Sequence, residues 1–163
     1  MTFRVALVVL SDKAASGERE DGCLAAMRAE LPAAFDIALE RILPDEQALI
    51  ESLLRDLCDK GAVDLVLTSG GTGLGARDVT PQATRAIAHY DVPGIAEAMR
   101  AASLARVPTA MLSRAIAAVR GRTLIVNLPG SPNGARETLA VIAGVLPHAL
   151  ELLSGASGEH QKT

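Results

Sequence analysis

The chain has 163 residues, of which 49% are hydrophobic and 21% charged, values close to those of soluble globular proteins. This length favours a single domain whose core is large enough to fold without disulfides or a structural metal. The formal net charge is −3 without any block of basic residues, and aromatic residues make up 2%. These values disfavour nucleic-acid binding, which needs a basic stripe or a base-stacking surface.

The domain is expected to cover residues 1–153, and a flexible polar tail is expected over residues 154–163. No uninterrupted apolar run reaches the ~18 residues of a membrane span, and the first residues show no secretory signal. We therefore expect a protein that makes no membrane contact and works in the cytoplasm. In that compartment Cys23 and Cys58 are expected to be buried thiols rather than a disulfide.

The first half of the chain is predicted to form three strands and two helices. Short apolar or alternating runs, bounded by polar residues or proline, predict strands at residues 3–10, 35–43 and 64–68. A short helix is expected at residues 24–31. A longer helix is expected from Asp45, a favourable N-cap residue, to Lys60-Gly61, a typical helix end.

The second half is predicted to add helices and one more strand. Thr80 followed by Pro81 has the pattern of an N-cap with proline at the first helical position, so helices are expected at 80–89 and 95–105. Residues 107–118 are ambiguous between helix and strand. A strand is expected at 123–127, followed by one long helix that begins at the N-cap Ser131 and continues to residue 153.

Strands that alternate with helices in this way predict a three-layer α/β/α fold with a mostly parallel sheet. In such folds ligands bind at the carboxyl ends of the strands. The predicted strands end in polar or glycine-rich segments at these positions: Ser11-Asp12, Pro44-Asp45, residues 69–73 and residues 127–131. Each segment alone is also typical of an ordinary turn.

The segment Ser-Gly-Gly-Thr-Gly at residues 69–73 is suited to binding phosphate, because glycines can turn successive N–H groups toward an anion. It lacks the lysine of a Walker A loop, and its spacing to the next helix does not fit a dinucleotide fingerprint. Arg77 and Asp78 follow, just before the helix expected at Thr80. A cation, a carboxylate and a helix N-terminus together suit a nucleotide phosphate with its magnesium ion.

Three motifs together carry a resemblance to a known family. They are Thr-Ser-Gly-Gly-Thr-Gly at residues 68–73, Arg-Asp-Val-Thr-Pro at 77–81 and Leu-Pro-Gly-Ser-Pro at 128–132. Ser11-Asp12, Pro-Asp-Glu-Gln at 44–47 and residues 108–114 add to it. In this combination the chain resembles, over nearly its whole length, the molybdopterin-binding family of molybdenum cofactor biosynthesis, and in particular its adenylyltransferase (Mog-type) branch.

The resemblance implies transfer of AMP from Mg-ATP to molybdopterin with release of pyrophosphate. It also implies a homotrimer and a molybdenum-insertion enzyme as a further partner. Two alternatives stay open at this point. One is a molybdopterin carrier of the MoaB type without catalysis, and the other is a different nucleotide reaction, as in the competence-induced relatives.

Asp45 and Asp78 are the candidate catalytic residues and the candidate ligands of Mg²⁺. The candidate substrate-binding residues lie in the strand-end loops and, for Ser113 and Arg114, in the ambiguous stretch 107–118: Ser11, Asp12, Ser69, Gly70, Gly71, Thr72, Gly73, Ser113, Arg114, Pro129, Gly130 and Ser131. Arg114 is expected to pair with a phosphate. The structural alternatives are a helix cap for Asp45, a turn or an ion pair with Arg77 for Asp78, and a surface strand position for Arg114.

The chain departs from the family pattern at Asn133, where a lysine is common. One cation is therefore missing near the expected anion site, and Lys13 is a candidate substitute.

Overall fold

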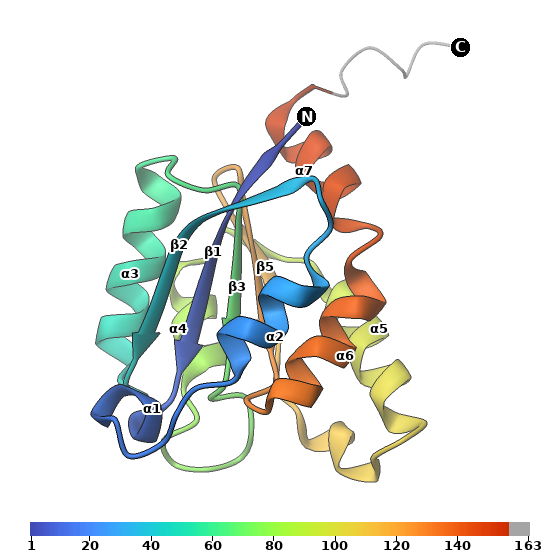
Figure 1. The fold of residues 1–163 in the computed structure, drawn as a ribbon. Coiled ribbons are helices and arrows are strands. Elements are labelled where there is room, and N and C mark those ends of the chain that lie inside the picture. The colour runs from blue at the N-terminus through green and yellow to red at the C-terminus, as the bar shows by residue number, and fades with distance from the viewer. Residues whose placement is uncertain (157–163) are drawn as a thin grey trace.

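The computed structural model describes residues 1–156 and shows one sheet between two layers of helices (Figure 1). The strand order is β2-β1-β3-β6-β5-β4, in which the first four strands are parallel and the last two are antiparallel to their neighbours. The strands are β1 (Phe3–Leu10), β2 (Phe35–Leu43), β3 (Leu65–Ser69), β4 (Tyr90–Asp91), β5 (Ala117–Arg120) and β6 (Thr123–Leu128). This arrangement confirms the predicted α/β/α fold with a mostly parallel sheet.

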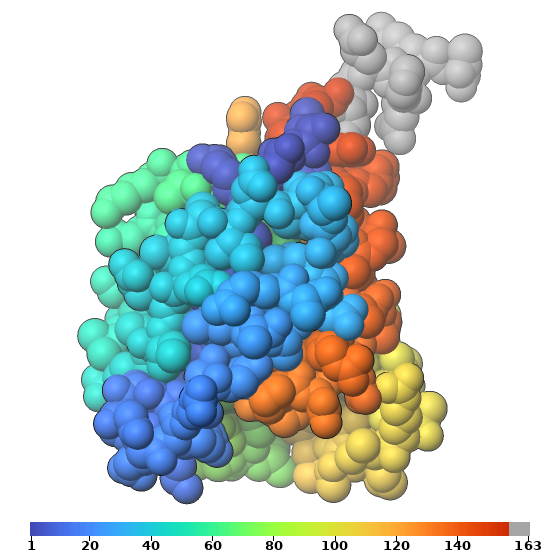
Figure 2. Space-filling view, in the orientation of Figure 1, coloured from blue at the N-terminus to red at the C-terminus, as the bar shows by residue number. Residues whose placement is uncertain are grey.

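Helices cover both faces of the sheet, as Figure 1 shows. Their bounds are α1 (Asp12–Ser16), α2 (Cys23–Glu30), α3 (Gln47–Asp59), α4 (Thr80–Ile87), α5 (Pro93–Leu104), η1 (Pro108–Leu112), α6 (Pro132–Ile142) and α7 (Leu146–Ser154), where η1 is a 3-10 helix. The space-filling view shows α2, in blue, directly beside α6, in orange (Figure 2). These two segments are far apart in the sequence and close one side of the molecule together.

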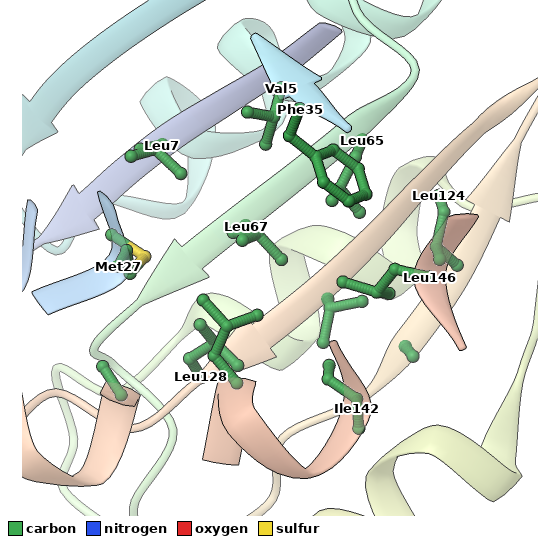
Figure 3. Packing of buried hydrophobic residues seen from close by; sticks show 14 of the residues in the cluster. Val5, Leu7, Met27, Phe35, Leu65, Leu67, Leu124, Leu128, Ile142 and Leu146 are labelled. Atoms are coloured by element: carbon green, nitrogen blue, oxygen red, sulfur yellow. The ribbon is translucent and has the colours of Figure 1, made fainter. Parts of the chain in front are cut away.

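The core consists of two apolar layers, because side chains alternate between the faces of each buried strand. On one face Leu7, Leu67 and Leu128 point into a cluster that includes Met27 of α2 and Ile142 of α6 (Figure 3). On the other face the intervening strand residues pack against α3 and α4: Ala6, Val8, Val66 and Ile125. Both layers anchor the carboxyl ends of the strands, where the candidate site lies.

The single long helix expected after Ser131 is wrong, because two helices occupy this segment. Helix α6 ends at Ile142, α7 begins at Leu146, and their axes differ by 63°. Pro147 explains the break, since in a continuous helix its ring would clash with the carbonyl four residues earlier. Within residues 1–156 no single helix is long and apolar enough to cross a membrane, and only this bent pair passes that test by length and composition.

Two helix starts also differ from the prediction. Neither Asp45 nor Thr80 is an N-cap, because α3 is preceded by Glu46 and α4 already begins at Thr80. Both side chains are used in tertiary hydrogen bonds instead. Ser131 does cap α6 as predicted, since its hydroxyl accepts from the N–H of Gly134 at 3.0 Å.

The ambiguous stretch 107–118 contains both kinds of structure. It forms η1 and then the start of β5, which pairs antiparallel with β6 and with the short strand β4 at the sheet edge. Cys23 and Cys58 are buried free thiols, as expected. Ser154 is the last residue of α7, and the remainder of the predicted tail lies almost entirely outside the described residues.

Asn127 joins β6 to the elements that carry the glycine-rich loop. It is completely buried, and its Nδ2 donates to the hydroxyls of Thr68 and Thr84, each at 3.0 Å. Its Oδ1 accepts from the N–H of Ile116 at 3.2 Å. The strand β3, the helix α4 and the segment before β5 are thereby held to one side chain.

Replacing Asn127 with Ala is expected to lower the free energy of unfolding by about 2–4 kcal/mol, because it leaves buried polar groups without partners and opens a cavity. The midpoint of urea unfolding measures this loss. Thr138→Val is the matched control, because among the described residues the buried Thr138 hydroxyl donates to carbonyls of its own helix and to no other element. Equal stability of Asn127→Ala and the wild type would contradict the bridging role.

Candidate functional site

The loops that follow β1, β2, β3 and β6 meet at one edge of the sheet and enclose a cavity of about 400 Å³. Eight of the predicted site residues line it: Ser11, Asp45, Ser69, Gly70, Gly71, Asp78, Gly130 and Ser131. The carboxyl ends of parallel strands lie side by side, which explains why loops distant in sequence converge here.

A second cavity of about 330 Å³ adjoins the first, since Ser131 lines both. Four more predicted site residues contribute to its wall: Thr72, Gly73, Ser113 and Pro129. Its remaining wall comes from α5, the segment that joins α5 to η1, η1 itself and α6, and it includes apolar side chains such as Met99, Val107 and Leu112. Asp12 and Arg114 line neither cavity.

The glycine-rich loop has the backbone shape expected of an anion-binding segment. Gly70 and Gly71 have φ values of 109° and 67°, in the region that favours glycine. The N–H of Gly70 donates to the carbonyl of Leu128 at 3.1 Å, so it is already engaged. The N–H groups of residues 71–73 donate to no other described residue and are available to an anion.

The loop is tied to the helix that follows it. The Thr80 hydroxyl donates to the Gly70 carbonyl at 2.9 Å, and the Thr80 N–H donates to the Gly71 carbonyl at 3.1 Å. A Cβ on Gly71 would lie 2.3 Å from the Thr80 hydroxyl oxygen. The close approach requires glycine at this position.

Arg114 shapes the same loop from its other side. Its Nε donates to the Gly73 carbonyl at 2.7 Å and its Nη2 to the Asp78 carbonyl at 2.6 Å. These bonds clamp the segment between the two carbonyls, and half-burial of Arg114 sets it apart from a surface strand residue. Pairing of Arg114 with a substrate phosphate stays a prediction.

Asp45 holds a carboxylate oxygen without a partner at the cavity. Its Oδ2 accepts from the N–H of Asp12 at 3.0 Å, whereas its Oδ1 is buried and accepts from no described residue. Burial raises the pKa of Asp45, and the negative charges of Asp12 and Asp78 raise it further. An unpaired buried oxygen is costly, and a cation bound at this place would relieve that cost.

Asp78 lies on the same cavity and organises the end of the glycine-rich loop. Its Oδ2 accepts from the N–H of Gly75 at 2.9 Å. The alternative ion pair between Asp78 and its neighbour Arg77 does not form, because Arg77 pairs with Asp12. Asp78 and Asp45 both line the first cavity.

Asp45 and Asp78 are two carboxylates, which suits Mg²⁺ better than a metal ion whose whole coordination shell comes from protein side chains. Within residues 1–156, no group of three or more His, Cys, Asp or Glu side chains could hold a metal. Mg²⁺ commonly binds through one or two carboxylates, with water and substrate phosphates completing its shell. The donor set fits that pattern.

Four polar side chains that the sequence reasoning missed also line the first cavity: Arg19, Glu20, Asp21 and Cys23. They belong to the polar loop before α2 and to its first residue, where no motif marks them. Arg19 is the one cationic side chain among the described residues of this lining, and its Nη2 donates to the Ser11 hydroxyl at 3.2 Å. Lys13, the candidate substitute for the missing lysine, is exposed and lies outside the lining.

Cys23 contributes a buried thiol at the base of this cavity. Its Sγ donates to the Gly130 carbonyl at 3.4 Å, which joins the start of α2 to the loop before α6. Burial raises the pKa of the Cys23 thiol. A protonated thiol suits a packing role better than a nucleophilic one.

Comparison with known proteins agrees with this arrangement of loops. Residues 6–148 match the family model described as a probable molybdopterin binding domain. The chain belongs to this family. The match extends from β1 into α7 and thus includes every loop that lines the two cavities.

Individual relatives are similar over nearly the whole chain. A molybdopterin adenylyltransferase of Escherichia coli is 43% identical, with 94% of this chain and 87% of the relative covered. The enzyme of the same name from Haemophilus influenzae is 41% identical, with 94% and 85% covered. The crystal structure of the molybdopterin biosynthesis enzyme MoaB from Thermus thermophilus is 50% identical, with a TM-score of 0.90 and 94% and 98% of the chains covered.

Proposed function

We propose that this protein is a molybdopterin adenylyltransferase of molybdenum cofactor biosynthesis, which transfers AMP from ATP to molybdopterin. An oxygen of the terminal phosphate of molybdopterin attacks the α-phosphorus of ATP. The bond from that phosphorus to pyrophosphate breaks as the new P–O bond forms. The full-length similarity to relatives with this name supports the proposal.

This reaction needs positioning and charge neutralisation more than a strong base, because the attacking phosphate is already an anion. The free N–H group of Gly71 would bind an ATP phosphate in the first cavity, and Arg19 would add a positive charge there. Asp45 and Asp78 would hold Mg²⁺, which neutralises phosphate charge when bound. The free Oδ1 of Asp45 is the observation that carries this assignment.

The second cavity would take the pterin ring. Its wall combines apolar side chains of α5 and η1 with the polar groups of Ser113 and Ser131. A flat ring with polar edges suits such a lining. Ser131 lies where the two cavities adjoin, so a molecule in each would meet near the N-terminus of α6.

The deciding experiment measures pyrophosphate release and AMP transfer when the purified protein is incubated with Mg-ATP, with and without molybdopterin. We expect release that depends on molybdopterin and stops when EDTA removes the metal. Tight binding of molybdopterin without release would instead make the protein a carrier.

Asp78→Asn is expected to lower the turnover number by about 10–100-fold, because the amide cannot supply a negative charge to the metal. The fold should be retained, since the amide oxygen can still accept from the N–H of Gly75. Pyrophosphate release and Tm test the two statements. Asp91→Asn is the control, because Asp91 is exposed and pairs with Arg85 on the surface. Wild-type turnover in Asp78→Asn would contradict the metal assignment.

We further propose that the protein works in the cytoplasm as a homotrimer and delivers its product to a molybdenum-insertion enzyme. A product that keeps an activated phosphate must be consumed by a later reaction, which is consistent with such a partner. Sedimentation at several concentrations tests the trimer.

A further inference from the structure

Arg77 binds the carboxylate of Asp12 with two hydrogen bonds. Its Nε donates to Oδ2 at 3.0 Å, and its Nη2 donates to Oδ1 at 2.8 Å. Arg77 lies between the glycine-rich loop after β3 and helix α4, whereas Asp12 is the first residue of α1, directly after β1. The pair thus joins two loops of the site, although neither side chain lines the first cavity.

Asp12 is in turn hydrogen-bonded to Asp45. The N–H of Asp45 donates to Oδ1 of Asp12 at 2.9 Å, and the N–H of Asp12 donates to Oδ2 of Asp45 at 3.0 Å. Each carboxylate therefore receives the backbone N–H of the other residue. This reciprocal pair fixes the loop after β2 against the loop after β1.

The consequence is a defined orientation of the Asp45 carboxylate. Because Oδ2 is held by Asp12, Oδ1 is the oxygen left without a partner at the cavity. A Cβ placed on Gly71 would lie 3.2 Å from Oδ1, so this oxygen sits against the glycine-rich loop. Replacing a residue that orients a metal ligand commonly lowers the metal affinity of the site, even though that residue does not touch the metal.

Stability alone does not account for the Arg77–Asp12 pair. The side chains are 61% and 42% exposed, and exposed ion pairs add little to the free energy of folding. Arg77 is also next to Asp78 in sequence, yet its guanidinium is directed to Asp12. The Arg77–Asp12 contact therefore supports the reciprocal hydrogen bonds between Asp12 and Asp45, which leave Oδ1 of Asp45 free.

We propose that Arg77 and Asp12 are positioning residues that hold the Asp45 carboxylate with Oδ1 toward a divalent cation bound with the nucleotide phosphates. The inference rests on the metal site in the proposed function. It goes beyond that site because it assigns Arg77 an effect on the metal that is exerted through Asp12 and Asp45, without contact between Arg77 and the metal.

The test measures binding of Mn²⁺ with α,β-methylene-ATP, which cannot transfer its AMP, by water proton relaxation. Arg77→Gln is expected to raise the Kd of this complex by about 10–100-fold. The Kd of the same nucleotide in EDTA should change by less than about twofold, since the pair does not line the cavity. Arg77→Lys keeps the charge but loses the paired geometry and should give an intermediate Kd.

Arg4→Gln is the matched control, because Arg4 forms a similar two-bond pair with Asp64 at the opposite ends of the strands. Both Arg→Gln variants should keep Tm within roughly 4 °C of the wild type. Only the Arg77 variant should lose metal affinity. Combining Arg77→Gln with Asp12→Asn should raise Kd no further than Asp12→Asn alone, because both changes break one connection.

Several outcomes would overturn the inference. A wild-type Kd in Arg77→Gln, or effects of the two substitutions that simply multiply, would show that Arg77 does not act through Asp12. An equal loss of nucleotide affinity with Mn²⁺ and in EDTA would mean that Arg77 binds the nucleotide directly. If the wild type formed no complex with Mn²⁺ and the nucleotide, the metal site itself would be refuted. AMP transfer is measured separately, so its absence from a metal-binding wild type would contradict the proposed function alone.

Discussion

Replacing Asp45 with Asn is expected to reduce AMP transfer by about 10²–10³-fold while leaving the protein at least as stable as the wild type. The loss follows because the amide cannot offer a charged oxygen at the position of Oδ1. Its remaining oxygen can still accept from the N–H of Asp12, so the contact between the two loops is kept. Pyrophosphate release and Tm in metal-free buffer measure the two effects.

The stability of Asp45→Asn relative to the wild type should depend on pH. Burial raises the pKa of Asp45, so its ionisation costs folding free energy as the pH rises through that pKa. The variant should therefore gain in Tm relative to the wild type at neutral pH. The gain should vanish well below pH ~4, where the carboxyl group is protonated in both the folded and the unfolded state.

Asp56→Asn controls for the change in net charge, because Asp56 is an exposed residue of α3 whose one ion pair within residues 1–156 is with Lys60. It should keep wild-type turnover. A fully active Asp45→Asn would refute the metal assignment, and a large loss of Tm would show that the charge itself holds the loops together.

Gly70→Ala is expected to lower the free energy of unfolding by about 3–5 kcal/mol, which corresponds to a fall in Tm of roughly 10 °C or more. Two costs combine here. The φ of 109° is unfavourable for any residue with a side chain, and the new Cβ would lie 2.2 Å from the Leu10 carbonyl oxygen. Relief of that overlap would move the glycine-rich loop away from β1, and nucleotide binding should fall as well.

Gly61→Ala separates the two costs. Gly61 also has a positive φ, of 59°, yet beyond its own chain neighbours no heavy atom of the described residues lies within 4 Å of the position its Cβ would take. This variant should lose only about 1–2 kcal/mol, the backbone cost alone. Equal losses in urea unfolding for the two variants would show that the approach of Gly70 to β1 is unimportant.

The sequence was sufficient for the four parallel strands and for the edge of the sheet at which the candidate site residues gather. Buried strands appear as short apolar runs, and the polar segments that follow them are local features of the sequence. The break at Ala143–Val145 was missed although Pro147 marks it in the sequence, because the apolar stripe continues through both helices and favoured one long helix. The short strand pair at the sheet edge was also missed, since such strands depend on their partners.

At the site, the sequence by itself determined which residue types gather: the glycines Gly70, Gly71 and Gly73 and the carboxylates Asp45 and Asp78. Only the tertiary structure decided what each group faces. Asp45 has the local pattern of a helix cap, yet its carboxylate binds Asp12 of another loop and keeps one oxygen free. Arg77 likewise prefers Asp12 to its sequence neighbour. Hydrogen bonds between loops depend on where the strands end in space, and strand pairing sets those positions.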